Sequence, residues 1–128
     1  MITQLGHVTL FVSNQDSALQ FFTEKLGFEK RDDDSTTMPN FRWLTVSPKN
    51  QPDVRIILMT PPPNLEGFVG KQAGWIFTTD DCRKDTEVFK SCGVKFTEES
   101  QEQFYGVQSI FQDNDGNSFL LIEPANRS

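Results

Sequence analysis

The spacing of apolar residues changes from strand-like to helical early in the chain. A short β-rich run, His7 to Val12, alternates in side-chain character and ends at cap-type residues. Apolar residues then recur at helical spacing at Leu19, Phe22 and Leu26, and Gly27 stands where a helix C-terminal glycine belongs. This pattern predicts a strand followed by a helix near residues 15–26.

Three further strands are predicted before residue 60. Residues 28–31 begin the first of them, which gives way to the acidic stretch 32–37, expected to be a loop. Residues 41–47 and 54–59 read as two strands joined by a turn rich in proline and amide residues. The first part of the chain therefore has the element order β-α-β-β-β.

After a proline-rich connector the same order returns. Residues 75–79 predict a strand, residues 82–92 a helix, and 94–97, 106–112 and 118–122 three strands. The two helix ends align, with Gly27 over Gly93. We therefore expect an α+β fold of two tandem βαβββ modules, each with its helix on one face of a curved mixed sheet and the other face free to form a cavity. One domain, 1–128, would comprise module 1 at about 1–60, a linker at about 61–73 and module 2 at about 74–125.

Composition limits the size of the protein and its redox chemistry. A chain of 128 residues is too short for a (β/α)₈ barrel or a two-domain dehydrogenase, and its 12 Phe, 2 Trp and 1 Tyr can build one core. Cys82 and Cys92 fall at opposite ends of one predicted helix, about 15 Å apart at 1.5 Å per residue. They cannot bond to each other, so reduced thiols are expected.

Charge makes several partners improbable. The 12 Lys and Arg against 18 Asp and Glu give a net charge of −6, which repels phosphate backbones and anionic lipids and is compatible with a neutral or cationic small molecule. The same charge also simply favours solubility. The N-terminus has no basic segment and no aliphatic run is long enough to cross a bilayer, so we expect a soluble cytoplasmic protein with no nucleic-acid or membrane partner.

Several motifs together resemble a known superfamily. They are G-H-V-T-L-F-V at 6–12, A-L-x-F-F-x-x-x-L-G-F at 18–28, T-D-D-C at 79–82, Y-G-x-x-x-x-F-x-D-x-D-G-N at 105–117 and F-x-x-I-E-P at 119–124. Their order and spacing resemble the vicinal oxygen chelate superfamily, the group of glyoxalases, bleomycin-resistance proteins and extradiol dioxygenases. The resemblance implies the two-module fold, and it leaves the chemistry open because one scaffold hosts several functions.

In metal-dependent members of that superfamily, side chains on the first and last strands of each module hold a divalent ion. The resemblance puts His7, the single histidine, on the first of these positions, and the others fall near Ile57, at Gly74 (or Ala73 or Trp75) and at Leu120. Three or more ligands must converge on such an ion, so we expect no metal site of this type and no cofactor. Glu123 or Glu66 would have to supply a ligand from elsewhere, and Asp113–Gly116 reads as a hairpin turn rather than a calcium loop.

Alternation along the strands predicts which side chains line the cavity. If His7 faces it, the neighbours on the same face include aromatic, aliphatic and a few polar residues. The ligand-binding residues predicted in this way are His7, Thr9, Phe11, Phe41, Trp43, Arg55, Ile57, Tyr105 and Leu120. Ordinary alternatives remain open: core packing for Phe41 and Trp43, a buried hydrogen-bonded His7, and a solvent-facing Arg55.

Three functions are compatible with these residues. The first is a metal-free binder of a small hydrophobic or cationic molecule, similar to the bleomycin-resistance proteins. The second is a metal-dependent lyase or dioxygenase of the same superfamily, and whether any catalysis occurs is left open. The third is an oligomerising or regulatory domain whose pocket is filled by its own side chains. A homodimer is expected because symmetric dimers are the commonest oligomers and paired modules in this superfamily complete cavities across chains.

Overall fold

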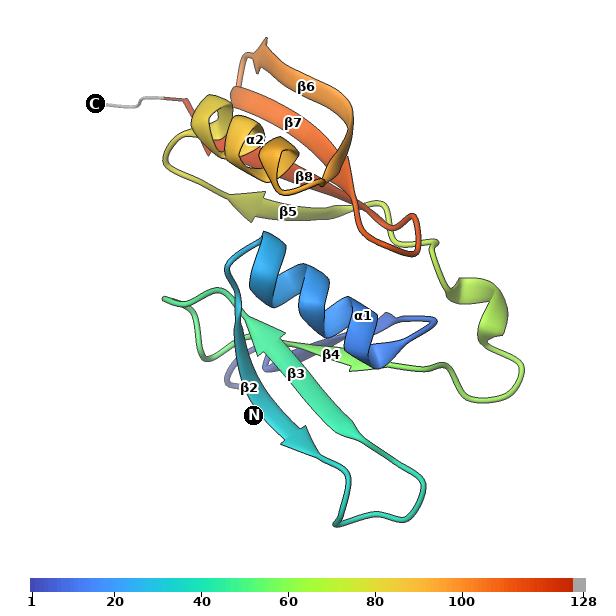
Figure 1. The fold of residues 1–128 in the computed structure, drawn as a ribbon. Coiled ribbons are helices and arrows are strands. Elements are labelled where there is room, and N and C mark those ends of the chain that lie inside the picture. Colours follow the sequence, from blue (N-terminus) through green and yellow to red (C-terminus); the bar gives the residue numbers. More distant parts are fainter. Residues whose placement is uncertain (126–128) are drawn as a thin grey trace. The chain divides into compact units, whose positions relative to one another are not determined.

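The computed structural model describes residues 1–125 and divides the chain into two compact units, one from Met1 to Val69 and the other from Gly70 onward (Figure 1). Each unit has the order β-α-β-β-β, which confirms the two tandem modules predicted from the repeat. The elements of the first unit are β1 (His7–Phe11), α1 (Gln15–Gln20), η1 (Phe21–Lys25), β2 (Glu29–Asp34), β3 (Trp43–Ser47), β4 (Arg55–Met59) and η2 (Glu66–Phe68). Those of the second are β5 (Trp75–Thr78), α2 (Cys82–Ser91), β6 (Lys95–Gln103), β7 (Gly106–Gln112) and β8 (Ser118–Pro124).

Each unit contains one four-stranded mixed sheet. The strand order is β1-β4-β3-β2 in the first unit and β5-β8-β7-β6 in the second. The first strand of each module runs parallel to the last, and the remaining neighbours are antiparallel. The fold is therefore α+β, as predicted. Within the described chain, no helix is long and apolar enough to cross a membrane.

The first helix begins where the sequence predicts and changes its pitch before it ends. Asn14 caps it by accepting a hydrogen bond from the Ser17 amide at 2.8 Å. From Phe21 the helix widens into the π-helical turn η1, where the Thr23 hydroxyl donates to the Leu19 carbonyl at 2.7 Å. Gly27 then ends it at φ +78, a conformation that glycine adopts without strain.

Two strands are longer than predicted. The predicted loop 32–37 is wrong over its first half, because β2 continues to Asp34 and pairs with β3 as far as Trp43. Strand β6 likewise runs to Gln103 rather than ending at residue 97. Both extensions are polar, so their side chains gave no strand pattern, yet their backbones find partners in the next strand.

One face of each sheet packs against its own helix. In the first unit, α1 contacts β4, and the buried apolar strand residues on the helix side are Leu10, Leu44, Val46, Ile56 and Leu58. In the second, α2 contacts β6, β7 and β8 above Phe111, Phe119 and Leu121. Cys82, the first residue of α2, is buried and Cys92 is exposed, and both are free, as expected. The alternate residues of the same strands form the helix-free face of each sheet.

Candidate functional site

Six of the predicted ligand-binding residues lie on the helix-free face of the first sheet. They are His7, Thr9 and Phe11 of β1, Trp43 of β3, and Arg55 and Ile57 of β4. Parallel pairing sets His7 beside Arg55 and Thr9 beside Ile57. The rings of His7 and Trp43 are 5.5 Å apart between centroids and tilted by 56°. These two side chains form an aromatic pair on this face, from strands on either side of β4.

A polar cluster that the sequence reasoning missed lies on the same face. The carboxylate of Asp32 accepts hydrogen bonds from the Thr45 hydroxyl at 2.6 Å and from Nη1 of Arg55 at 2.9 Å. The hydrogen bond from Thr45, together with Arg55, lowers the pKa of Asp32 against the opposing effect of burial. Arg55 also donates through Nε to the Pro52 carbonyl at 3.1 Å, so its guanidinium is held in place. We call Asp32, Thr45 and Arg55 the charged triad.

The positions expected to hold a metal do not offer a suitable donor set. Ile57 of β4 is buried and Leu120 of β8 is half-buried, and neither can bind an ion. Gly74 precedes β5, and the ring of Trp75 packs against Phe119 with 5.9 Å between centroids. Within residues 1–125, His, Cys, Asp and Glu side chains nowhere gather in a group of three that could hold an ion. The donors present therefore do not fit the divalent metal of the superfamily.

The two carboxylates considered as substitute metal ligands, Glu123 and Glu66, lie in other surroundings. Glu123 shares a strand face with Phe119 and Leu121, and its Oε1 accepts a hydrogen bond from the backbone amide of Cys82 at 3.0 Å. Its negative charge thus lies at the N-terminus of α2, where a helix stabilises an anion. Glu66 is exposed in the short helix η2. The position of Glu123 agrees with the prediction that an odd offset turns it away from the open face.

Tyr105 and Leu120 meet in a pocket on the helix-free face of the second sheet. The pocket has a volume of about 380 Å³ and is lined by Ile76, Tyr105, Gln108, Leu120, Ile122 and Pro124. The Tyr105 hydroxyl donates to Oε1 of Gln108, and Nε2 of Gln108 donates to Oε2 of Glu98 at 2.8 Å. Of these residues, the sequence predicted Tyr105 and Leu120. It missed Gln108 and Glu98, because only the pairing of β6 with β7 brings them together.

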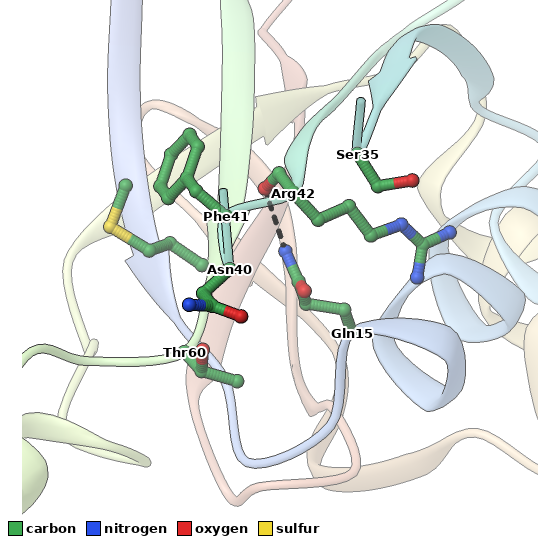
Figure 2. Close-up of a pocket in the computed structure, with 7 residues that line it drawn as sticks. Gln15, Ser35, Asn40, Phe41, Arg42 and Thr60 are labelled. Atoms are coloured by element: carbon green, nitrogen blue, oxygen red, sulfur yellow. Dashed lines mark hydrogen bonds between the residues drawn. The ribbon is translucent and has the colours of Figure 1, made fainter. Parts of the chain in front are cut away.

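Phe41 lies before β3 rather than within it, and it lines another pocket of the first unit. This pocket measures about 310 Å³, and its walls are Gln15, Ser35, Asn40, Phe41, Arg42, Met59 and Thr60 (Figure 2). Nε2 of Gln15 donates to the carbonyls of Leu58 at 2.8 Å and Arg42 at 3.2 Å. The start of α1 is thereby tied to the chain on either side of the pocket.

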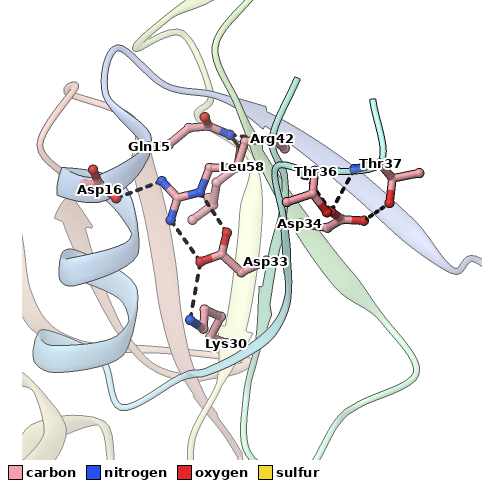
Figure 3. A network of polar contacts seen from close by, with 9 residues as sticks. All are labelled: Gln15, Asp16, Lys30, Asp33, Asp34, Thr36, Thr37, Arg42 and Leu58. Atoms are coloured by element: carbon pink, nitrogen blue, oxygen red, sulfur yellow. Dashed lines mark hydrogen bonds and ion pairs between the residues drawn. The ribbon is translucent and has the colours of Figure 1, made fainter. Parts of the chain in front are cut away.

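Arg42 connects three segments of the first unit (Figure 3). Its Nε and Nη2 donate to the two oxygens of Asp33 at 2.8 and 3.0 Å, and its Nη1 donates to Asp16 of α1 at 2.7 Å. The guanidinium, joined by Lys30, lowers the pKa of Asp33. Asp34 accepts hydrogen bonds from Thr37 and Thr36, which lower its pKa to about 2. This network holds the β2–β3 hairpin to the helix.

The turn Asp113–Asn117 is structural, as predicted. Asp113 accepts hydrogen bonds from the amides of Asp115 and Asn117 at 3.0 and 2.9 Å, and from the side-chain amide of Asn117 at 2.9 Å. Asn117, which is buried, accepts in turn from the Gln72 amide at 2.9 Å. The turn therefore fastens the segment before β5 to the β7–β8 hairpin, and burial raises the pKa of Asp113.

The sequence and the structure are both similar to known proteins. The model of the Glyoxalase/Bleomycin resistance protein/Dioxygenase superfamily matches residues 4–121. The Bacillus subtilis (strain 168) protein YetH, described as uncharacterized, is 36% identical over 123 residues, which span 96% of this chain and 100% of YetH.

Two solved structures resemble this one closely. TnmS3, an antibiotic binding protein from Streptomyces sp. CB03234, has a TM-score of 0.86 at 29% identity, with 97% of this chain and 98% of TnmS3 covered. A member of the same superfamily from Sphaerobacter thermophilus DSM 20745 has a TM-score of 0.85 at 31% identity, with 95% of this chain and 98% of that one covered. Both similarities extend over the two modules.

Proposed function

The chain belongs to the glyoxalase/bleomycin resistance protein/dioxygenase superfamily, and from that premise we propose that it binds a small hydrophobic or cationic molecule without a metal ion. The ligand would be bound on the helix-free face of a sheet, each sheet being considered by itself. On the first sheet the contacts would come from the residues predicted there, His7, Thr9, Phe11, Trp43, Arg55 and Ile57, joined by Asp32. On the second sheet they would come from Tyr105 and Leu120, beside Gln108, and Phe41 would contact a ligand in the pocket that it lines in the first unit. We also propose that the protein is a homodimer.

One observation carries this proposal: the helix-free faces present aromatic and aliphatic side chains at the positions that metal-dependent members need for ligands. Ile57 and Leu120 stand at two such positions, and His7 packs against Trp43. An apolar lining with a few fixed polar groups is typical of small-molecule sites. The similarity to TnmS3, which is described as an antibiotic binding protein, supports the same class of function.

The aromatic and charged side chains on the first sheet suit a ligand that has both an apolar surface and polar groups. Trp43 and His7 would stack on a flat group of the ligand. The charged triad keeps a guanidinium and a carboxylate side by side, with their side chains 36% and 31% exposed. Because the two charges are already paired, an apolar molecule can approach this face without leaving a lone ion stripped of water.

The test is a ligand screen with two readouts. A library of flat aromatic and of cationic amphipathic compounds is screened by thermal shift, since binding raises the unfolding temperature by mass action. Replacing Trp75 with Phe leaves Trp43 as the single tryptophan, so quenching of its fluorescence reports binding at the first sheet. Trp43→Ala should weaken binding of an aromatic hit by about 1 kcal/mol, roughly fivefold in Kd. A library without any hit would contradict the proposal.

The metal-free part of the proposal needs its own measurement. Protein purified without chelator should contain much less than one equivalent of Zn, Ni, Fe or Mn, and His7→Ala should leave that content unchanged, because a lone imidazole binds such ions weakly. One equivalent of metal that is lost in His7→Ala would overturn it. That outcome would favour a metal-dependent lyase or dioxygenase instead.

A further inference from the structure

The pocket of the second sheet presents little polarity to a ligand. Its walls are aliphatic, formed by Ile76, Leu120, Ile122 and Pro124. Gln108 is buried, whereas Tyr105 is half-buried and its phenol lies at the pocket. A hydrophobic molecule in this pocket would therefore make its polar contact with the phenol oxygen of Tyr105.

The hydrogen bonds behind Tyr105 all run in one direction. A carboxylate has no hydrogen to donate, so Glu98 accepts from the amide nitrogen of Gln108 at 2.8 Å. The carbonyl oxygen of Gln108 then faces Tyr105 and accepts from its hydroxyl. The opposite amide orientation would set two acceptor oxygens against each other at Glu98. Through these two successive hydrogen bonds, Glu98 fixes the direction in which the Tyr105 hydroxyl points its hydrogen.

We infer that this pocket selects hydrophobic ligands that carry a hydrogen-bond donor, such as a hydroxyl or an N–H group, and discriminates against ethers and other pure acceptors. The single hydroxyl hydrogen of Tyr105 is used on Gln108, so its oxygen can offer a ligand only a lone pair. This inference rests on the proposed function, because it specifies the chemistry of the ligand bound on the same face.

The preference follows from the cost of an unmatched acceptor. A ligand hydroxyl replaces the water that Tyr105 loses, whereas an ether oxygen in its place faces another oxygen and leaves both without a hydrogen. The difference expected for one such contact is about threefold to tenfold in Kd.

The test compares 2-naphthol with 2-methoxynaphthalene, which share a ring system and differ in the donor. Tyr105 is the only tyrosine, so protein labelled with 3-fluorotyrosine gives one ¹⁹F resonance that reports binding at this pocket. Affinities are measured on unlabelled protein by calorimetry. We expect 2-naphthol to shift the resonance and to bind about threefold to tenfold more tightly than the ether.

Two variants and a matched control separate the hydrogen-bond direction from simple packing. Gln108→Met removes the acceptor, which frees the Tyr105 hydroxyl to donate, so the preference should fall to within about twofold or reverse. Tyr105→Phe should abolish the preference, because it removes the phenol oxygen that accepts the ligand's hydrogen. Gln101→Met makes the same change at an exposed residue of β6 and should keep the preference. If Gln108→Met does not fold, Tyr105→Phe decides.

The outcomes distinguish this inference from the proposed function. Equal affinity of both compounds, with the resonance shifted by each, overturns donor selection and leaves the proposed function intact. A preference that survives in Tyr105→Phe also overturns it. Absence of any shift with either compound overturns the inference as well, and the proposed function then stands or falls on its own ligand screen.

Discussion

At the scale of single residues, Gly106 shows how tightly the second pocket is built. Its backbone has φ +142, and a Cβ there would lie 2.0 Å from the carbonyl oxygen of Glu123 and 3.0 Å from the amide nitrogen of Ala125. Ala125 also donates to the carbonyl of Tyr105 at 2.9 Å. The chain therefore approaches β8 closely at the residue after Tyr105, and only glycine permits that approach.

Replacing Gly106 with Ala should lower the free energy of unfolding by about 2 kcal/mol or more, because the added methyl group meets backbone that cannot move aside. Gly67→Ala is the matched control, since no heavy atom lies within 4 Å of a Cβ there. Urea unfolding of the two variants and the parent chain measures the difference. Equal midpoints for the two variants would contradict the close approach.

Alternation along the strands predicted which face the strand residues of the site occupy, and it could not predict what those residues contact. It set His7, Trp43 and Arg55 on one face because adjacent residues of a strand point to opposite sides. The partner of Arg55, Asp32, is 23 positions away in the sequence, and a β-bulge between Lys30 and Asp32 breaks the period. A contact set by strand register leaves no local signal in the sequence.

At the scale of elements, β2 is a strand formed entirely from charged residues. Its side chains are neutralised partly within the strand, where Lys30 pairs with Asp33 and Arg31 with Glu29. Cations from other segments do the rest: Arg42 pairs with Asp33, and Arg55 pairs with Asp32. The sequence pattern indicated a loop from residue 32 because Arg42 and Arg55, which pair with Asp33 and Asp32, follow only later in the chain. The π-helical turn η1 was not predicted either, because apolar spacing does not distinguish it from an α-helical turn.

The charges of β2 predict how stability depends on pH. The pKa values of Asp32, Asp33 and Asp34 are lowered in the folded chain, that of Asp34 to about 2. Their stabilising contribution is therefore complete above pH 4 and is lost as the pH falls from about 4 to 2. Asp113 acts in the opposite sense, because its pKa is raised and its ionisation above pH 4 disfavours the fold.

Asp33→Asn should flatten this pH dependence. The variant keeps the shape of the side chain and loses the charge that faces Arg42, so its free energy of unfolding should fall less than that of the parent between pH 5 and pH 2.5. Chemical unfolding followed at several pH values measures both curves. Asp53→Asn, an exposed carboxylate in the turn between β3 and β4, is the control. Parallel curves for Asp33→Asn and the parent would refute the role given to Asp33.

At the scale of the whole molecule, the internal sequence repeat was the basis for most of the fold prediction. Two β-α-β-β-β patterns in one chain, with glycines at matching helix ends, were sufficient to predict both sheets and both helices. The size and polarity of the pockets depend instead on side chains that meet across strands, such as Gln108 with Glu98. Such contacts between side chains can be inferred from a single sequence only once the strand register is known.

The proposed homodimer is tested by its mass in solution. Light scattering at tens of micromolar protein should give about twice the 14.6 kDa of one chain. Dilution over two orders of magnitude shows whether the dimer dissociates, and addition of a ligand found in the screen shows whether binding and association are coupled. A mass that stays near 14.6 kDa at every concentration would exclude the dimer.

The pairing of each module's first strand with its own last strand bears on how the chain folds while it is being synthesised. Strand β1 finds its neighbour only when β4 has been made, and all four strands of the first sheet are then present. At about 5–20 residues per second, a ribosome then needs several more seconds to complete the second module. Small mixed α/β domains fold within milliseconds to seconds. The first module therefore has time to fold before β8 has been synthesised. Early folding of this kind keeps the two similar modules from exchanging strands in the nascent chain.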